Sequence, residues 1–137
     1  MLPVPIFDIP VVLQKISDEK ISAIPGPPTL YLTILNHPDR AKFDLSSLRL
    51  AVNGAAAVPV EMIKRMRDEL NFEVILTAYG LTESTGTVTM CRAEDDPVTI
   101  STTSGRAITD VDVRIIDENN NEVSRGQSGE IVCRGYN

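Results

Sequence analysis

The fold is decided by one stretch of sequence, Glu73-Val74-Ile75-Leu76-Thr77-Ala78-Tyr79-Gly80-Leu81-Thr82-Glu83-Ser84. Its first six residues form an apolar run that predicts a buried β-strand. The last six leave that strand and bring an aromatic ring, a glycine, hydroxyl groups and a carboxylate. Because ligands bind at the carboxyl ends of strands in open α/β sheets, these groups stand where a ligand-binding loop is expected.

The side chains of this hexapeptide suit a nucleotide and its metal ion. Tyr79 offers a flat aromatic face with a polar tip, and Gly80 allows an unusual turn or a close approach to a ligand. Thr82 offers a hydroxyl group and Glu83 a hard anionic oxygen. Mg²⁺ selects such an oxygen when it keeps most of its waters and shares the rest of its shell with substrate phosphates. The structural alternative is an ordinary strand end followed by a turn.

The composition indicates a globular chain without a nucleic-acid or membrane partner. The 137 residues are 42% hydrophobic and 23% charged, which is enough apolar content for one core. The net charge is -6 and the 13 Lys and Arg residues are scattered, so no cationic surface for a phosphate backbone or an anionic membrane is expected. No apolar run has the length of a membrane span, and no signal-peptide pattern follows Met1. We expect a soluble, cytoplasmic protein.

Cysteine and histidine usage argues against two further classes of site. Cys91 and Cys133 lie far apart without a C-x-x-C spacing, and the chain has one histidine, His37. Neither a zinc site nor a disulfide framework is indicated. We expect both thiols to be reduced and to pack as small apolar groups, and His37 to be a solvated residue at a helix end.

The first half of the chain alternates short apolar strands with amphipathic helices, the pattern of a βαβ fold. Helices are predicted after the cap residue Asp8, from Pro27-Pro28 to about Leu35, and from Pro59. Their predicted buried residues are Ile9, Val12, Leu13 and Ile16 in the first helix and Met62, Ile63, Met66 and Leu70 in the third. Strands are predicted at Ile21–Ile24, stopped by Pro25-Gly26-Pro27-Pro28, at Ser47–Val52 and at Glu73–Ala78. The expected class is α/β, a partial parallel sheet with flanking helices in the order βαβαβ.

The second half changes character after the polar turn Glu94-Asp95-Asp96-Pro97, where we expect no further helical period. The segment Asp110–Ile116 alternates polar and apolar residues, and Gly129–Arg134 gives a partner strand beyond a turn-rich segment. These patterns predict an antiparallel β meander. We expect residues 1–92 to form the α/β sheet portion and residues 93–137 a mainly β portion. The stop directly after a strand suggests that residues 1–137 are a single fragment of a larger domain.

Five short motifs occur in a fixed order along the chain. They are Pro25-Gly26-Pro27-Pro28-Thr29, Leu48-Arg49 with Gly54-Ala55-Ala56-Ala57-Val58-Pro59, Tyr79-Gly80-Leu81-Thr82-Glu83, Ser104-Gly105-Arg106 with Val111-Asp112-Val113-Arg114-Ile115, and Gly126-Gln127-Ser128-Gly129-Glu130-Ile131 with Arg134-Gly135-Tyr136. Together they resemble the middle of an adenylate-forming, AMP-binding enzyme of the acyl-CoA synthetase (fatty-acid-CoA ligase) branch. The resemblance covers nearly the whole chain and implies a part of the N-terminal domain of such an enzyme.

The resemblance implies a two-step ligation that uses ATP, Mg²⁺ and coenzyme A. A small-molecule carboxylate attacks the α-phosphorus of ATP to give an acyl-adenylate and pyrophosphate, and the CoA thiol then takes the acyl group. By the same resemblance Tyr79 stacks on adenine, and Gly80 belongs to the same nucleotide-binding loop. Small residues at Gly54, Ala55 and Ala56 let the main chain pass along the purine edge.

The resemblance also assigns catalytic and acyl-side positions. Thr82 bonds a phosphate oxygen, and Glu83 holds Mg²⁺, whose charge offsets that of the departing pyrophosphate. Gly86 borders the acyl tunnel. The remaining positions implied near the carboxylate and acyl group are Pro27, Thr29 and Leu30.

The chain departs from the family pattern in several places. It contains no glycine-rich, Ser/Thr-rich loop ending in lysine, no ribose-binding aspartate of a T-G-D motif and no distal adenylation lysine. Ala107 and Thr109-Asp110 stand where the family often has proline and Pro-Gly. Because positioning and charge stabilisation of the triphosphate supply much of the rate, we expect the parent enzyme to be the ligase and the isolated chain to be inactive.

Two classes of function remain open. The first is a region of an ATP-dependent acid–thiol ligase, although amino-acid adenylation domains and luciferases share these signatures. The second is a non-catalytic nucleotide-binding or scaffold module that keeps a nucleotide cradle. For Gly54–Ala57 the alternative is a tight crossover that packs a helix close to a sheet. In either class, uncovered sheet edges favour self-association of the chain, or disorder near residues 126–137.

Overall fold

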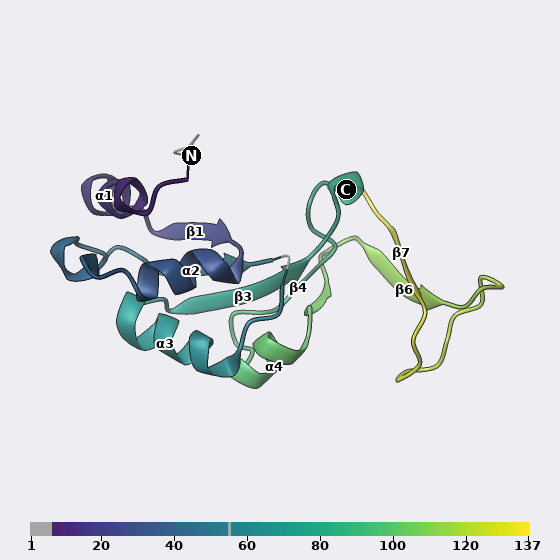
Figure 1. Cartoon of the computed structure of the whole chain (residues 1–137). Helices are drawn as coiled ribbons and strands as arrows, with labels where there is room; N and C mark the ends of the chain where they lie inside the picture. The colour runs from purple at the N-terminus through teal and green to yellow at the C-terminus, as the bar shows by residue number, and fades with distance from the viewer. Residues whose placement is uncertain (1–6, 55) are drawn as a thin grey trace.

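The structure is a computed structural model that describes residues 7–54 and 56–137. Its elements follow the chain in the order α1 (Ile9–Glu19), β1 (Ala23–Gly26), α2 (Pro28–Leu35), η1 (Arg40–Lys42), β2 (Leu50–Asn53), α3 (Val60–Leu70), β3 (Val74–Tyr79), η2 (Thr82–Ser84), β4 (Thr89–Met90), α4 (Pro97–Thr102), β5 (Arg106–Ala107), β6 (Asp112–Ile116) and β7 (Glu130–Arg134). Figure 1 shows the four helices gathered around the first strands, with the β6–β7 hairpin extending to one side. Among these described helices, none is long and apolar enough to span a membrane.

The main sheet has five strands in the order β1-β2-β3-β4-β5. Strands β1, β2 and β3 are parallel, and their register places Gly26 beside Asn53 and Asn53 beside Thr77. Strands β4 and β5 continue the sheet in antiparallel orientation, while β6 and β7 form a second, antiparallel sheet. The predicted α/β class with a partial parallel sheet is confirmed, and its antiparallel part consists of β4 and β5 at the edge of the main sheet and the separate β6–β7 hairpin.

Helix α1 begins as its sequence predicts. The Asp8 side chain accepts a hydrogen bond from the Val11 amide over 3.1 Å, and a proline stands in the first turn. The helix ends at Lys20, whose φ of 51° is left-handed. Three of the four predicted stripe residues are buried and Val12 is half-buried, so this helix contributes one apolar face to the core.

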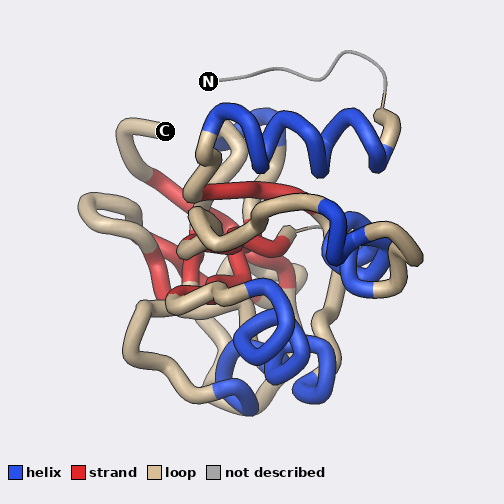
Figure 2. The backbone as a smooth tube through the Cα atoms, turned by 90° about the vertical axis from the view of Figure 1, so that its left-hand side faces the viewer, coloured by secondary structure: helices blue, strands red, loops and turns tan. Residues whose placement is uncertain are grey.

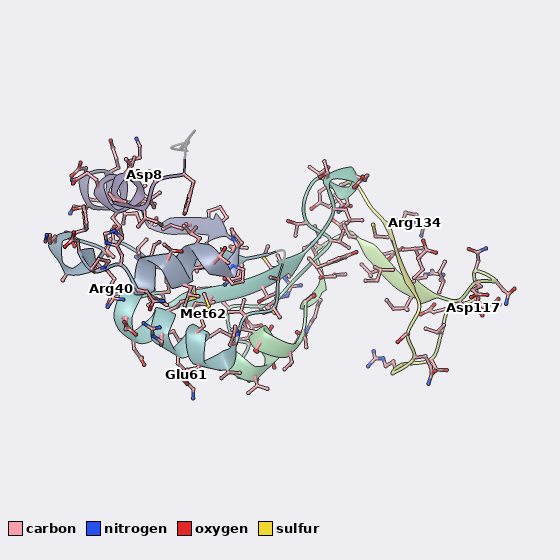
Figure 3. The ribbon with its side chains drawn as sticks, in the orientation of Figure 1. Asp8, Arg40, Glu61, Met62, Asp117 and Arg134 are labelled. Atoms are coloured by element: carbon pink, nitrogen blue, oxygen red, sulfur yellow. The ribbon has the colours of Figure 1, made fainter. Side chains whose placement is uncertain are left out.

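The predicted buried face of α3 is confirmed. Pro59 precedes the helix, and the residues Met62, Ile63, Met66 and Leu70 are all buried. In Figure 3 Glu61, the neighbour of Met62 in sequence, extends from the outer side of the helix. The face carried by Met62 therefore packs against the interior, as its i, i+4 spacing requires.

Strands β1 (Ala23–Gly26) and β2 (Leu50–Asn53) both lie later in the chain than the predicted Ile21–Ile24 and Ser47–Val52. β1 runs from Ala23 through Gly26, so the expectation that Pro25 stops it is wrong. β1 is an edge strand, where a proline is tolerated because one side of the strand has no partner. β2 begins at Leu50 rather than at Ser47, whose hydroxyl donates to the Ile21 carbonyl over 2.8 Å. The preceding residues are used in a turn instead of the strand.

The expectation of no helix after residue 94 is wrong, because α4 forms at Pro97–Thr102. Asp96 caps it by accepting hydrogen bonds from the amides of Val98 and Thr99 over 2.8 and 3.1 Å. The hydrogen bond from the Thr99 hydroxyl and, to a smaller extent, those from the two amides hold the pKa of the Asp96 carboxyl below its usual range. An Asp-Pro pair is a helix-start signal, and in so short a helix it replaces the missing apolar period.

The sheet has one buried face and one half-exposed face. Ala51, Asn53, Ile75 and Thr77 point to the buried face, under the helices. The alternate residues Leu50, Val52, Val74 and Leu76 are only half-buried. Figure 2 shows the strands in the middle of the molecule, with helices above, below and to the right. Parallel sheets normally have both faces covered. Since the described residues cover the second face of this sheet only in part, that face can accept further packing.

Tyr31 joins α2 to the sheet, and its removal should destabilise the fold. Its hydroxyl lies 2.6 Å from the Ile24 carbonyl and 3.2 Å from the Val52 carbonyl, and burial raises the pKa of the phenol. We expect Tyr31→Phe to lower the free energy of unfolding by about 1–3 kcal/mol, because it removes the hydroxyl that bonds these part-buried strand carbonyls. Urea unfolding measures the change. In the control Tyr136→Phe, the side chain is 75% exposed, and a change within about 0.5 kcal/mol is expected.

The uncovered edges should make the chain self-associate. Ile131 on β7 is 45% exposed at the edge of a two-stranded sheet, and exposed apolar edges pair with other chains. We expect light scattering to show a mass that rises with concentration, and Ile131→Lys to reduce this rise. The same change at Leu32, which is 44% exposed on a helix, is the control. A monomer at all concentrations would contradict the expectation.

Candidate nucleotide-binding site

Three loops leave the parallel strands at the same edge of the sheet. The register of β1, β2 and β3 aligns Gly26, Asn53 and Thr77, so the chain leaves the strands at neighbouring positions. The loop after β1 begins at Pro27, the loop after β2 at Gly54, and β3 continues through Tyr79. The structure thus brings together the starts of the three segments that the sequence singled out.

Gly54 lies against the end of β3. A Cβ added to Gly54 would stand 3.8 Å from the Ala78 carbonyl oxygen and, apart from its chain neighbours, would meet no other atom of the described residues within 4 Å. The strand end is therefore open on the side where a side chain would project. Ala55 lies outside the described residues, and Ala56 is exposed. A side chain at position 54 would therefore project beside the Ala78 carbonyl at the end of β3.

The segment between β3 and β4 folds back tightly on itself. The Val88 amide donates to the Tyr79 carbonyl over 2.8 Å, and β4 returns antiparallel to β3. A Cβ added at Gly80 would stand 2.7 Å from the Thr87 Cα and closer still to the Gly86 carbonyl. Only glycine allows this approach. Gly80 is therefore a structural requirement of the loop, whatever it contributes to a ligand.

The turn at residues 81–87 directs Thr82 and Glu83 to the surface. The Leu81 carbonyl accepts a hydrogen bond from the Gly86 amide over 2.9 Å, and the Ser84 hydroxyl accepts one from the Leu81 amide over 3.1 Å. Ser84 is buried while Thr82 and Glu83 are exposed. Among these three side chains, Ser84 thus fixes the backbone while Thr82 and Glu83 face solvent.

The Glu83 carboxylate is free to bind a cation. Within residues 7–54 and 56–137, no ion pair or hydrogen bond engages its oxygens. The same residues contain no group of three or more potential metal ligands. A single exposed carboxylate fits Mg²⁺, which takes one or two protein oxygens and completes its shell with waters and phosphates. It does not fit a metal ion whose coordination shell needs three or more protein ligands.

The predicted acyl-side residues lie in two places, at the start of α2 and in the turn after η2. Pro27 is exposed, Thr29 is exposed and Leu30 is half-buried at the start of α2. A Cβ added at Gly26 would stand 2.6 Å from Leu30 Cδ2, so Leu30 packs across the end of β1. Gly86 has a φ of 90° and would accept a Cβ without contact. Its glycine serves the backbone conformation, and the acyl-side roles stay predictions.

Two residues that hold the site were not assigned a role from sequence. Ser84 fixes Leu81 through its hydroxyl, and the Asn137 side chain donates to the carbonyls of Ser84 and Thr87 over 3.3 and 2.8 Å. For Ser84 the signal was its place three residues after Leu81, as in a helix cap. No local signal points to Asn137, because its partners are distant in sequence.

Comparison with known proteins identifies the family. The pattern of the family described as AMP-binding enzyme matches residues 1–137, the whole chain. The chain belongs to the AMP-binding enzyme family. The relatives of this AMP-binding chain lie in the acyl-CoA ligase branch, as the ordered motifs predict.

Two curated relatives are similar over the whole chain. Both are 7a-methyl-1,5-dioxo-octahydro-1H-inden-4-yl propanoyl:CoA ligases. The one from Rhodococcus jostii is 53% identical over 137 residues, covering 100% of this chain and 24% of the relative. The one from Mycobacterium tuberculosis is 48% identical, covering 100% of this chain and 25% of the relative. The AMP-binding chain thus spans about a quarter of the length of these ligases.

The fold agrees with that of a solved ligase domain. The inhibitor-bound N-terminal domain of FACL13 from Mycobacterium tuberculosis superposes with a TM-score of 0.82 at 26% identity, covering 96% of this chain and 32% of that domain. The AMP-binding chain therefore has the architecture of part of an acyl-CoA ligase N-terminal domain.

Alanine substitutions at Gly80 and Gly54 should differ in their effect on the stability of the fold. Gly80→Ala should lower the free energy of unfolding by about 1–3 kcal/mol, because the added methyl group overlaps the Gly86–Thr87 backbone. Gly54→Ala should change it by less than about 0.5 kcal/mol, since the methyl group meets only ordinary contacts. Urea unfolding of both variants checks the order. Equal losses would show that the loop is not packed as described.

Proposed function

We propose that this chain forms part of the nucleotide-binding region of an ATP-dependent acyl-CoA synthetase. In the proposed reaction a carboxylate oxygen attacks the α-phosphorus of ATP, and the bond from that phosphorus to the pyrophosphate oxygen breaks. The sulfur of CoA then attacks the carbonyl carbon of the acyl-adenylate, and AMP leaves. Family membership and the identity of the relatives support the ligase chemistry.

The observation that carries the proposal is the alignment of the ends of β1, β2 and β3 at one sheet edge, with an exposed Glu83 on the loop that continues β3. Adenine would enter the space beside Gly54 and stack on the ring of Tyr79. Thr82 would donate its hydroxyl hydrogen to a phosphate oxygen, and Glu83 would orient the metal-bound phosphates. The acid would bind near Pro27, Thr29, Leu30 and Gly86. These roles agree with the exposure of each side chain.

Glu83 is the described residue best suited to hold Mg²⁺, which when bound would stabilise the charge of the leaving pyrophosphate. The remaining positions of its shell would come from water and phosphate oxygens. Thr82, on the same 3-10 turn, would bind the phosphate without competing for the cation. We further infer a cytoplasmic enzyme, in keeping with the free thiols of Cys91 and Cys133.

The acid is proposed from the two similar ligases. Both act on a propanoate carried by an oxidised, methylated bicyclic ring. We infer that the parent of this chain activates a carboxylic acid of that class, a short carboxylate side chain on fused rings, in preference to a straight-chain fatty acid. Because the chain spans about a quarter of those ligases, residues outside it complete the acid pocket.

The second candidate is a non-catalytic nucleotide-binding module formed by these residues alone. Such a module would bind ATP with the same three strand ends and the exposed residues Thr82 and Glu83. The two candidates differ in their chemistry, since a module would bind ATP without releasing pyrophosphate. Another adenylating enzyme, such as an amino-acid adenylation domain, would release pyrophosphate with amino acids instead.

The metal-binding role of Glu83 can be tested by ATP–pyrophosphate exchange in the complete polypeptide. We expect Glu83→Gln to lower the exchange rate at least about a hundredfold, because loss of a metal ligand removes several kcal/mol of charge stabilisation. Glu118→Gln, at an exposed carboxylate on the distant hairpin turn, is the matched control and should keep the rate. An unchanged rate in Glu83→Gln would remove this carboxylate from the mechanism.

The same assay identifies the acid. We expect exchange with fused-ring propanoates to exceed exchange with straight-chain fatty acids and with amino acids. Exchange with amino acids alone would favour the adenylation-domain alternative. ATP binding without exchange for any acid would favour the non-catalytic module.

A further inference from the structure

Asn137 contacts the turn that carries Thr82 and Glu83. Its side-chain amide donates to the Thr87 carbonyl over 2.8 Å and to the Ser84 carbonyl over 3.3 Å. These partners are 50 and 53 residues away in sequence. Figure 1 shows this end of the chain, marked C, beside the loop that follows β3. The contact is therefore tertiary, and it brings the end of β7 to the candidate phosphate and metal loop.

The two accepting carbonyls flank the least favourable part of the turn. Thr85 and Gly86 lie between them, with positive φ angles of 54° and 90°. A β-branched residue such as Thr85 rarely takes this conformation, which costs free energy that the surroundings must offset. The Asn137 carboxamide has two N–H hydrogens, and it donates one to the Ser84 carbonyl and one to the Thr87 carbonyl. Asn137 thus holds both ends of the segment that follows Glu83.

Asn137 also joins the β6–β7 hairpin to the main sheet through hydrogen bonds. In the described part of the chain, the hydrogen bonds from residues 112–137 to residues 7–107 are the two made by Asn137. A Cβ added at Gly135 would stand 2.7 Å from Val111 Cγ2 and 2.8 Å from Asn137 Oδ1. Glycine at position 135 therefore lets the hairpin end pass close to Val111 and present the carboxamide to the turn.

We propose that Asn137 is a positioning residue for the ATP phosphates and their Mg²⁺. Its carboxamide fixes the backbone of the Leu81–Thr87 turn, and this turn sets where the Thr82 hydroxyl and the Glu83 carboxylate stand. The orientation of the β6–β7 hairpin is thereby coupled to nucleotide binding. The inference rests on the proposed function, because it assigns these two side chains to phosphate and metal.

The test variant is Asn137→Asp in the complete polypeptide. Aspartate has the same size, but at neutral pH it has no hydrogen to donate and places a negative charge against two carbonyl oxygens. Asn137→Gln restores the carboxamide one methylene further out. Asp112→Asn is the matched control. It exchanges a carboxylate and a carboxamide on the same hairpin, and the interaction that it weakens is the exposed ion pair with Arg134 at 3.0 Å.

Two readouts are measured for each variant. Hydrogen exchange of the amides in residues 82–88 reports the turn itself, and ATP–pyrophosphate exchange at varied ATP, Mg²⁺ and acid reports its use. For Asn137→Asp we expect roughly tenfold faster amide exchange and roughly tenfold higher half-saturating ATP and Mg²⁺, as for the loss of one or two hydrogen bonds. The KM for the acid should rise less than the half-saturating ATP and Mg²⁺, because of the proposed acyl-side positions only Gly86 lies in this turn, while Pro27, Thr29 and Leu30 follow β1. Asn137→Gln should recover part of each loss, and Asp112→Asn should match the wild type.

Each other outcome overturns the inference in a recognisable way. Unchanged amide exchange in Asn137→Asp would show that the carboxamide does not hold the turn, whatever the activity. Faster amide exchange with unchanged ATP and Mg²⁺ requirements would show a structural role only. If the wild type shows no acid-dependent pyrophosphate exchange, the proposed function itself fails and the nucleotide part of the inference fails with it.

Discussion

The parallel register of β1, β2 and β3 is the constraint on which the site depends. Because Gly26, Asn53 and Thr77 stand side by side, three loops from different parts of the chain must leave the sheet at one edge. A shift of β2 by one residue would turn Asn53 away from the core and move Gly54 from beside Ala78. The buried residues under α3 and α4 fix this register, so the core and the site are set by the same alternation of side chains.

The fold was predictable where local chemistry and burial agree. The caps at Asp8 and Pro59 and the apolar stripe of α3 specify helices without tertiary information, and the structure has them. The prediction failed where tertiary position decides, as in the strand β1, which includes Pro25 only because it is an edge. It also failed at α4, which is too short to show an apolar period and depends on its Asp96 cap.

The position of the candidate site at the strand ends was predictable from the sequence, but the contacts that hold its loop were not. The sequence located the residues at the ends of β2 and β3, because strand ends are where such groups converge. It did not indicate that Gly80 is required by backbone packing, or that Ser84 holds Leu81. The role of Asn137 depends on a contact across 53 residues, which no local pattern encodes.

The long reach of Asn137 has a consequence for the order of assembly during synthesis. The crossovers that pair β1 with β2 and β2 with β3 close early, since each joins neighbouring segments. The bond to Ser84 must wait until the hairpin has been translated and folded. Within the described residues, the loop that bears Glu83 is thus completed after the parallel strands have paired, which couples its final conformation to the emergence of the β6–β7 hairpin from the ribosome.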